Sequence, residues 1–324
     1  MNIKYLITGG SGFIGTNLIN QLIYHKKIKV DLLNIDIAKP KLSTHLMFWK
    51  YCNINNYNLL TKIIDSYQPT HIIHLAAEAD VRFKSLNDFT TNINGVFNLC
   101  SAINDCDSVK RVIFTSTQYV HQFNGQPQKD DEYYPFTIYG ESKAKGEQIV
   151  REFNLDKIWT IIRPTNIYGP FNDVYVKGLF KVIRKGYYFH PNINIIRSYG
   201  YVGTVVEQII KIFDTKSNLV NCKTFYLGDE PIQLLRFVKA VHNYLYKEKL
   251  KIAPIWLFRI AAFIGELAKS MNYPFPMNKV RYINMVTANP VNMNETFKVL
   301  GKGSLCFDER INNTINWYLN ESSQ

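Results

Sequence analysis

The sequence predicts an α/β protein with a doubly wound parallel sheet, and two observations support this fold class. Short apolar runs alternate with longer segments of helical periodicity through the first half of the chain: KYLITGG, VDLLNID, THIIHLAA, RVIFTST and WTIIRPT. The runs are apolar throughout, as strands buried on both faces require, and do not alternate between apolar and polar residues. Because strands separated by helices form parallel sheets, helices are expected on both faces of this sheet.

The first apolar run ends in a glycine-rich loop, TGGSGFIG, and a helical pattern follows it. Glycines tolerate positive φ angles and leave room for a pyrophosphate, while the next helix N-terminus offers N–H groups and a positive dipole end. A strand, such a loop and a helix in this order are typical of a Rossmann-type dinucleotide site. The residues of this segment expected to contact the cofactor are Gly9, Gly12, Phe13, Ile14 and Gly15.

The second apolar run, VDLLNID, ends in an acidic residue, Asp36. A carboxylate there accepts hydrogen bonds from the adenosine ribose hydroxyls and repels a 2′-phosphate. The sequence therefore favours NAD over NADP. In the alternative interpretation, Asp36 only ends the strand, and nearby Lys39 and Lys41 bind a phosphate.

Length and composition indicate a folded cytoplasmic protein. The 324 residues, 46% of them hydrophobic, suffice for one large domain or two smaller ones. The five cysteines are scattered and lack metal-ligand spacing, which predicts a reducing compartment and no metal. No secretory signal is visible. The lysines behind the net charge of +12 are spread out, so we expect no nucleic-acid surface, although the charge helps to attract a nucleotide diphosphate.

The most apolar late segment, APIWLFRIAAFIGELA at 253–268, is too short to cross a bilayer and contains Arg259 and Glu266. No membrane span is expected. We interpret the segment as a helix packed on the core, and an interfacial membrane helix is the less favoured alternative.

Several ordered motifs together resemble the extended short-chain dehydrogenases/reductases, in particular the NAD-dependent epimerase/dehydratase group that acts on nucleotide sugars. Beside the glycine loop, the resemblance lies in IIHLAAEADVR at 72–82, NINGVFNL at 92–99, FTSTQYV at 114–120, YGESK at 139–143 and RPTNIYGP at 163–170. It implies a Rossmann-type domain with a smaller, discontinuous substrate-binding domain over its open edge.

The resemblance assigns the catalytic residues. Tyr139 and Lys143 share a helix face one turn apart. In this family the tyrosine is the acid/base for a sugar hydroxyl, and the lysine binds the nicotinamide ribose and lowers the tyrosine's pKa. Thr117 corresponds to the hydroxyl residue that bonds the same substrate oxygen. Ser116, its neighbour, is the weaker candidate.

The resemblance also implies further cofactor contacts. Asn92 supports the active-site helix, Ala76 and Ala77 line the nicotinamide side, and Ile54 packs on the adenine. Asn53 replaces an aspartate that contacts this base. The cofactor-binding residues expected outside the glycine loop and Asp36 are Asn53, Ile54, Leu75, Ala76, Ala77, Asn92, Tyr139 and Lys143.

Substrate contacts are expected mainly from the second domain. Beside Thr117, the candidates are Asn166, Arg197 and Arg82, and the guanidinium of Arg197 suits bidentate binding of phosphate oxygens. For Arg197 a surface or ion-pair role is an equal alternative.

The expected NAD-binding domain spans 1–165, with 197–226 returning to it. The substrate-binding domain takes 166–196 and 227–324.

Three departures from the family pattern qualify the assignment. Gln118 and Tyr119 replace the Asp-Glu pair of the dehydratases, which disfavours a 4,6-dehydratase because neither ionises usefully at neutral pH. His121 replaces a tyrosine, and no role is assigned to it. Gly203 and Thr204 replace two aspartates near the substrate pocket.

The resulting prediction is a cytoplasmic NAD-dependent 4-epimerase of a nucleotide-activated sugar, in the synthesis of polysaccharide or glycan precursors. The alternatives are an NAD(P)-dependent reductase of a 4-keto sugar or steroid-like carbonyl, and a non-catalytic NAD-sensing protein. The resemblance also implies a homodimer, in which helices near 88–105 and 140–153 form a four-helix interface.

Overall fold

The computed structural model describes residues 3–25, 31–80, 83, 85–123, 127–246, 248–271, 273 and 275–321. The chain forms two compact units. Unit 1 comprises Met1–Phe171, Gly200–Asp229 and Asn292–Ser304, and unit 2 comprises Asn172–Tyr199, Glu230–Val291 and Leu305–Gln324. The expected division into NAD-binding and substrate-binding domains remains a prediction about function.

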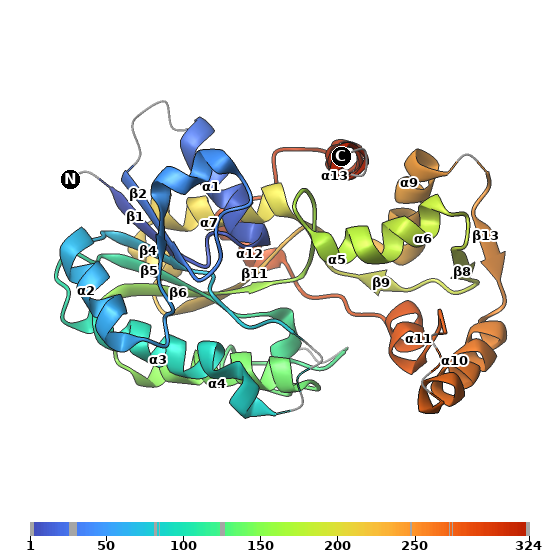
Figure 1. The fold of residues 1–324 in the computed structure, drawn as a ribbon, viewed down its shortest axis with the longest axis horizontal. Helices are drawn as coiled ribbons and strands as arrows, with labels where there is room; N and C mark the ends of the chain where they lie inside the picture. The colour runs from blue at the N-terminus through green and yellow to red at the C-terminus, as the bar shows by residue number, and fades with distance from the viewer. Residues whose placement is uncertain are drawn as a thin grey trace. The chain divides into compact units, whose positions relative to one another are not determined.

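Unit 1 is built on a seven-stranded sheet in which every neighbouring pair of strands is parallel (Figure 1). The five apolar runs all form strands of this sheet, which confirms the predicted fold class. In spatial order the strands are β11 (Lys223–Leu227), β6 (Ile158–Pro164), β5 (Arg111–Thr115), β4 (His71–His74), β1 (Lys4–Thr8), β2 (Asp31–Asp36) and β3 (Trp49–Tyr51).

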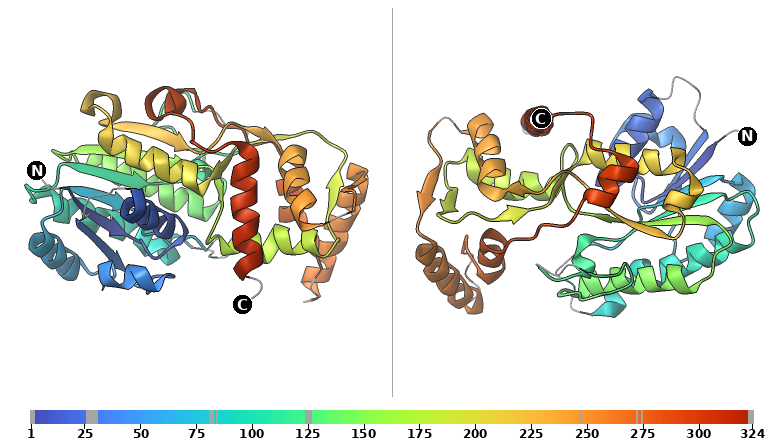
Figure 2. Two further views of the ribbon diagram at one scale, coloured as in Figure 1. Left: turned by 90° about the horizontal axis from the view of Figure 1, so that it is seen from above. Right: turned by 180° about the vertical axis from the view of Figure 1, so that it is seen from behind.

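Helices cover both faces of the sheet (Figures 1 and 2). One face carries α1 (Phe13–His25) and α7 (Val202–Asp214), which contact each other. The other face carries α2 (Tyr57–Tyr67), α3 (Thr90–Asn104) and α4 (Ile138–Glu152), in which α3 packs against both neighbours. At the sheet centre Leu6 pairs with Leu33 and Ile72, and Leu6 and Ile72 are fully buried. Burial from both sides explains why these strands are continuously apolar.

The strand order reverses between β1 and β4. From β1 the chain proceeds outward through β2 and β3, and from β4 it proceeds the other way through β5 and β6. Ligands of doubly wound sheets bind at the carboxyl ends of the strands flanking such a reversal. The glycine loop follows β1 and Leu75–Ala77 follow β4, so the topology brings the two predicted cofactor segments together.

Shorter elements complete unit 1. Residues 292–304, which the sequence analysis assigns to the substrate-binding domain, lie in this unit because Thr296 donates a hydrogen bond to the Tyr226 carbonyl and Leu300 is buried. The remaining elements are β7 (Asn166–Tyr168), its partner β10 (Tyr199–Tyr201), α8 (Ser217–Val220), α12 (Asn294–Leu300) and three short 3₁₀ helices at Ser43–Phe48, Leu86–Phe89 and Gln118–Val120.

Unit 2 is mainly helical. Its strands pair two by two, β8 (Phe189–Pro191) with β13 (Lys251–Ala253) and β9 (Ile196–Arg197) with β12 (Ile232–Gln233). The first elements of unit 2 are α5 (Asp173–Tyr175), a π-helical turn (Val176–Phe180) and α6 (Lys181–Arg184). The longer helices are α9 (Leu234–Leu245), α10 (Ile255–Ser270), α11 (Lys279–Val286) and α13 (Phe307–Glu321).

The apolar segment at 253–268 forms α10, but its expected packing on the core holds for one face only. Phe258, Ala262 and Gly265 are buried, whereas most of the other large apolar side chains are exposed. None of the helices in the described part of the chain has the length and hydropathy needed to span a bilayer.

Candidate active site

The glycine loop turns tightly at the carboxyl end of β1. Gly9 has a φ of +72°, and a Cβ at this position would lie 2.4 Å from the Ala76 backbone nitrogen. The Gly12 N–H donates to the Gly9 carbonyl at 3.1 Å, after which α1 begins at Phe13. A Cβ at Gly15 would lie 2.5 Å from the Cα of Gly10. The loop therefore requires glycine, and it leads directly to the first N–H groups of α1, which have no intrahelical acceptor.

Asp36 lies beside this loop. Its Oδ2 accepts the Ser11 N–H at 3.0 Å, and its Oδ1 accepts the Ala38 N–H at 2.9 Å. Each oxygen keeps acceptor capacity for a ribose hydroxyl. Lys39 and Lys41 are both exposed, and the Lys41 ammonium donates to the Phe171 carbonyl.

Asn34 of β2 supports the glycine loop, and the sequence analysis missed it. Its fully buried amide accepts the Gly10 N–H at 2.9 Å and donates to the Ser11 hydroxyl at 3.2 Å. A polar residue within an otherwise apolar strand, two positions before Asp36, was the available signal. Asn34 and Asp36 together hold the loop in place for a pyrophosphate.

The segment after β4 forms the other side of the strand reversal. The Leu75 N–H donates to the Thr8 carbonyl at 2.9 Å, and the Ala76 N–H donates to the Thr8 hydroxyl at 3.2 Å. Ala77 is exposed. These backbones lie next to the glycine loop, as a nicotinamide contact requires.

The two residues assigned to adenine differ in exposure. Asn53 is exposed, and its Oδ1 accepts the Asn55 N–H. Ile54 is 4% exposed and packs against Gly95 of α3, so it belongs to the hydrophobic core. Its contact with a base remains a prediction.

Asn92 connects the β4 segment to α4. Its Oδ1 accepts the Glu78 N–H at 2.8 Å, and its Nδ2 donates to the Glu78 carbonyl and, at 2.8 Å, to the Ser142 hydroxyl. Ser142 in turn donates to the Tyr139 carbonyl at 2.7 Å. This chain of bonds fixes the first turn of α4, where Tyr139 lies.

The catalytic candidates converge at the start of α4. Thr137 caps this helix by accepting the Gly140 N–H, and a Cβ at Gly140 would meet the Tyr119 carbonyl oxygen at 2.2 Å. The close approach places Tyr139 against the 3₁₀ turn after β5. There the Thr117 hydroxyl lies near the Tyr139 phenol and favours its ionised form.

Burial dominates the ionisation of Tyr139 and Lys143. Burial raises the pKa of Tyr139 to about 12, which the nearby Thr117 hydroxyl counteracts only in part. The lowering of this pKa that the sequence analysis expects from Lys143 and a bound nicotinamide remains a prediction. Burial lowers the pKa of Lys143 itself to about 8, although the Glu147 carboxylate raises it. Lys143 therefore stays mainly cationic at neutral pH, and the phenol is protonated.

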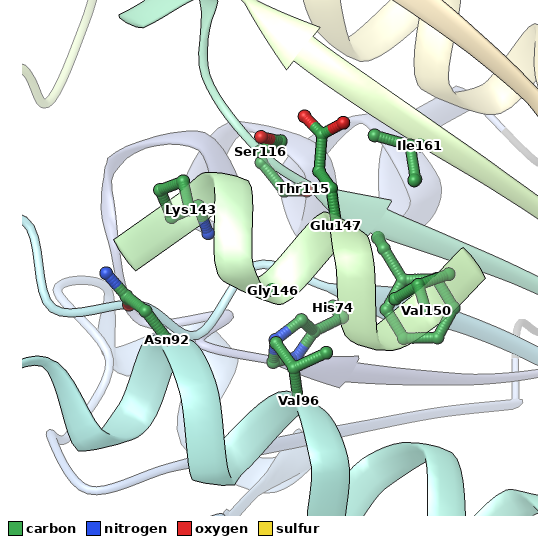
Figure 3. A pocket seen from close by; sticks show the side chains of 11 residues that line it. His74, Asn92, Val96, Thr115, Ser116, Lys143, Gly146, Glu147, Val150 and Ile161 are labelled. Carbon is green, nitrogen blue, oxygen red and sulfur yellow. The ribbon is translucent and has the colours of Figure 1, made fainter. Parts of the chain in front are cut away.

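A small cavity lies under α4, and Figure 3 shows Lys143, Gly146, Glu147 and Val150 of this helix around it. His74 at the end of β4 points into it. Burial, with a contribution from Lys143, lowers the pKa of His74 to about 3, so its ring is neutral. The ring also bonds the Thr8 hydroxyl at 2.7 Å.

Beside the cavity, Glu147 pairs with Arg163 of β6. The fully buried guanidinium donates to both carboxylate oxygens, at 2.9 and 2.7 Å. It also donates to the Asp130 carbonyl at 2.7 Å and bonds the His121 Nε2 at 3.1 Å. Glu147 follows Lys143 by one helical turn, a signal to which the sequence analysis gave no weight. His121 thus has a structural contact, and burial and the Arg163 charge lower its pKa to about 4.

The substrate candidates lie in different places. Asn166 on β7 accepts a hydrogen bond from the Tyr119 hydroxyl at 2.7 Å. Tyr119 belongs to the 3₁₀ turn Gln118–Val120, which Thr117 caps, so Asn166 lies beside this turn. Arg197 belongs to unit 2, where it is buried and donates to the Asn284 carbonyl. Arg82 lies outside the described residues. The roles of all three in substrate binding remain predictions.

Comparison with known proteins identifies the class. The profile of the NAD dependent epimerase/dehydratase family matches residues 5–228, and the chain belongs to this family.

Among its relatives, N-acetyl-alpha-D-glucosaminyl-diphospho-ditrans,octacis-undecaprenol 4-epimerase of Escherichia coli O157:H7 is 27% identical over 283 residues, covering 86% of this chain and 77% of the relative. Protein CapI of Staphylococcus aureus is 27% identical over 290 residues, covering 77% and 85%.

Solved structures share the fold. UDP-glucose 4-epimerase of Thermotoga maritima, crystallised with UDP-glucose, superimposes with a TM-score of 0.74 at 20% identity and covers 99% of this chain and 100% of its own. UDP-glucuronic acid 4-epimerase of Bacillus cereus, in complex with UDP-glucuronic acid and NAD, has a TM-score of 0.73 at 18% identity and covers 98% and 100%.

Proposed function

We propose that this protein is an NAD-dependent 4-epimerase of a sugar carried on a diphosphate, most directly a nucleotide sugar. The observation that carries the proposal is the Thr117 hydroxyl beside the Tyr139 phenol, with Lys143 one turn further along α4. These three residues belong to a chain of the NAD dependent epimerase/dehydratase family. Gln118 and Tyr119 cannot supply the acid and base of a dehydratase, which leaves epimerisation as the better supported branch.

The residues around the glycine loop fit NAD. Gly9 leaves no space for a side chain, whereas a Cβ at Gly12 would meet only the Gly9 carbonyl oxygen, at 3.3 Å, so the loop is open above Gly12. Gly12, Phe13 and Ile14 would hold the pyrophosphate, and Asp36 the adenosine ribose. Because Asp36 is anionic and adjacent to this loop, NAD is preferred to NADP. When bound, NAD accepts a hydride from C4 of the sugar and later returns it.

Tyr139 carries the proton in this scheme. Its phenolate takes the proton of the C4 hydroxyl as a 4-keto sugar forms, and its phenol returns a proton to the keto oxygen after the sugar turns over. No net proton or electron is consumed. Because the pKa of Tyr139 is about 12 without a ligand, ionisation needs a nearby positive charge. Lys143 and the cationic nicotinamide ring supply such charges.

The position of Asn92 and Ser142 supports this proton transfer. Their hydrogen bonds fix the Tyr139 carbonyl, so the phenol is held close to Thr117 as the substrate binds. Because the phenol is in position before the substrate binds, the reaction does not require a rearrangement of α4. Asn166 and Arg197 are the residues we propose for the substrate.

The test is an incubation with UDP-sugars and catalytic NAD. Because the E. coli relative is named for a sugar on an undecaprenyl diphosphate, the panel includes a polyprenyl diphosphate sugar. We expect proton NMR to show a change of configuration at C4 while nicotinamide absorbance stays constant. Stoichiometric consumption of NADH with a keto sugar, and no epimer from any alcohol, would move the assignment to a reductase. NAD binding without turnover of any sugar would favour the sensing alternative.

We also propose a cytoplasmic homodimer with α3 and α4 at its interface. These helices pack side by side, and Phe97 of α3 is 52% exposed although it contacts the Phe153 ring. In a four-helix interface this side chain would be buried against the helices of the partner subunit. Sedimentation equilibrium measures the oligomeric state directly.

A further inference from the structure

Helix α10 in unit 2 carries large apolar side chains on its solvent-facing side. Its buried residues, Phe258, Ala262 and Gly265, follow one face, and a Cβ at Gly265 would clash with the Met277 carbonyl oxygen. This face packs against the segment leading to α11, its neighbour in Figure 1. At 100° per residue, the exposed apolar residues centre on the opposite face. They are Trp256, Leu257, Ile260, Phe263, Ile264 and Leu267, with Met271 directly after the helix.

The exposure of this face is large. Phe263 is 66% exposed, Trp256 57% and Leu267 52%, and the face runs along the whole helix. A continuous apolar face of this kind marks a binding surface, in contrast to single exposed apolar residues.

Exposed basic side chains occur on α10 and in the segments before and after it. Lys251, Arg259, Lys269, Lys279 and Arg281 are all exposed. Glu266 on the same helix accepts the Lys279 backbone N–H, so part of its charge is already engaged. Within 251–281 the described residues thus present five exposed cations and one acidic side chain.

This charge pattern selects the occupant. A second copy of the chain, docked face to face, would bring its cations against these, which is unfavourable. An anionic lipid surface instead attracts these cations and accepts the exposed apolar side chains of α10. Trp256 at the start of α10 and Tyr273 just after it are exposed at both ends, where aromatic side chains favour the headgroup region of a bilayer.

We propose that α10 docks on the anionic surface of a lipid bilayer, lying in the plane of the interface with its apolar face in the headgroup and acyl boundary. The length of α10, 16 residues, suits a helix that lies on the surface. This inference uses no part of the proposed reaction, and it can fail while the reaction stands.

The experiment measures co-sedimentation of the full chain with vesicles of phosphatidylcholine and phosphatidylglycerol, and with phosphatidylcholine alone. We expect binding to the anionic vesicles that weakens with added salt. The double variant Phe263→Glu/Leu267→Glu should lower the partition coefficient by about a hundredfold, because two large apolar side chains leave the interface and two negative charges enter it. Arg259→Gln and Lys279→Gln should each lower it by about fivefold, with little effect on pure phosphatidylcholine.

The matched control is Tyr24→Glu/Met47→Glu, which makes the same change of charge at exposed apolar residues of unit 1 and should bind nearly as wild type. NAD titration and thermal melts establish that every variant is folded. A blue shift of tryptophan fluorescence on vesicle addition that Trp256→Phe abolishes, with binding retained, supports the docked orientation.

Wild-type protein that stays in the supernatant with anionic vesicles overturns the proposal. In that case an oligomer that the Phe263→Glu/Leu267→Glu variant dissociates would assign the face to a second copy. Equal loss of vesicle binding in the unit 1 control also overturns it, because charge alone would then explain the effect.

Discussion

Replacing Glu147 by glutamine should destabilise unit 1 strongly. The side chain of Arg163 is fully buried, and its charge is balanced by two hydrogen bonds to Glu147, at 2.9 and 2.7 Å. Glutamine keeps the size and one acceptor but leaves the guanidinium charge uncompensated. For unit charges about 4 Å apart at an effective dielectric constant near 20, the lost attraction is about 4 kcal/mol. Removing one partner of a buried pair costs about 3–5 kcal/mol in general.

The assay is urea unfolding followed by tryptophan fluorescence. We expect Glu147→Gln to lose about 3–5 kcal/mol of unfolding free energy. Glu152→Gln, an exposed position of the same helix, should change it by less than about 0.5 kcal/mol. The double variant Glu147→Gln/Arg163→Met removes both charges and should be more stable than Glu147→Gln alone. If Glu147→Gln unfolds like Glu152→Gln, the buried pair does not stabilise the fold as argued.

Three further predictions concern the cofactor and the reaction. Wild-type protein should bind NAD more tightly than NADP by titration calorimetry, and Asp36→Ser should reduce this preference; equal affinities in the wild type contradict the role of Asp36. Tyr139→Phe should lower turnover by about a hundredfold or more with NAD binding retained, and near-normal turnover would exclude the phenol as the proton carrier. Since the pKa of Lys143 is about 8, its charge is present below that pH, and NAD affinity should fall as the pH rises through it. The Lys143→Met variant should lack this step, and Glu147→Gln should move it to lower pH; a wild-type profile without a step near pH 8 contradicts the assignment.

Much of the geometry of the candidate cofactor site was predictable because its determinants are local. The strand, glycine loop and helix are contiguous, so TGGSGFIG predicts their order without tertiary information. The position of Asp36 follows from the end of the next strand. The spacing of Tyr139 and Lys143 likewise follows from helix geometry alone.

Other features depend on tertiary contacts that no local pattern encodes. Arg163 meets Glu147 only because β6 lies under α4, and Asn34 meets the Gly10 N–H only because β2 pairs with β1. The raised pKa of Tyr139 reflects burial by residues from several elements. An inference from the Tyr–Lys spacing counts the charge and omits that burial.

The exposed face of α10 could likewise not be predicted from the sequence. Composition shows that 253–268 is apolar, but not which of its faces unit 2 covers. A helix that is apolar on two faces fits burial and surface docking equally well until the packing is known.

The most direct test of the central claim follows the hydrogen at C4. A substrate that the protein turns over, labelled with deuterium at C4, is incubated with unlabelled NAD in ordinary water, and the product epimer is analysed by NMR and mass spectrometry. If Tyr139 moves the hydroxyl proton while hydride leaves C4 and returns to the opposite face of the same sugar, the epimer retains deuterium at C4. Loss of deuterium from C4 to solvent, or its accumulation in released NADH, would contradict the account.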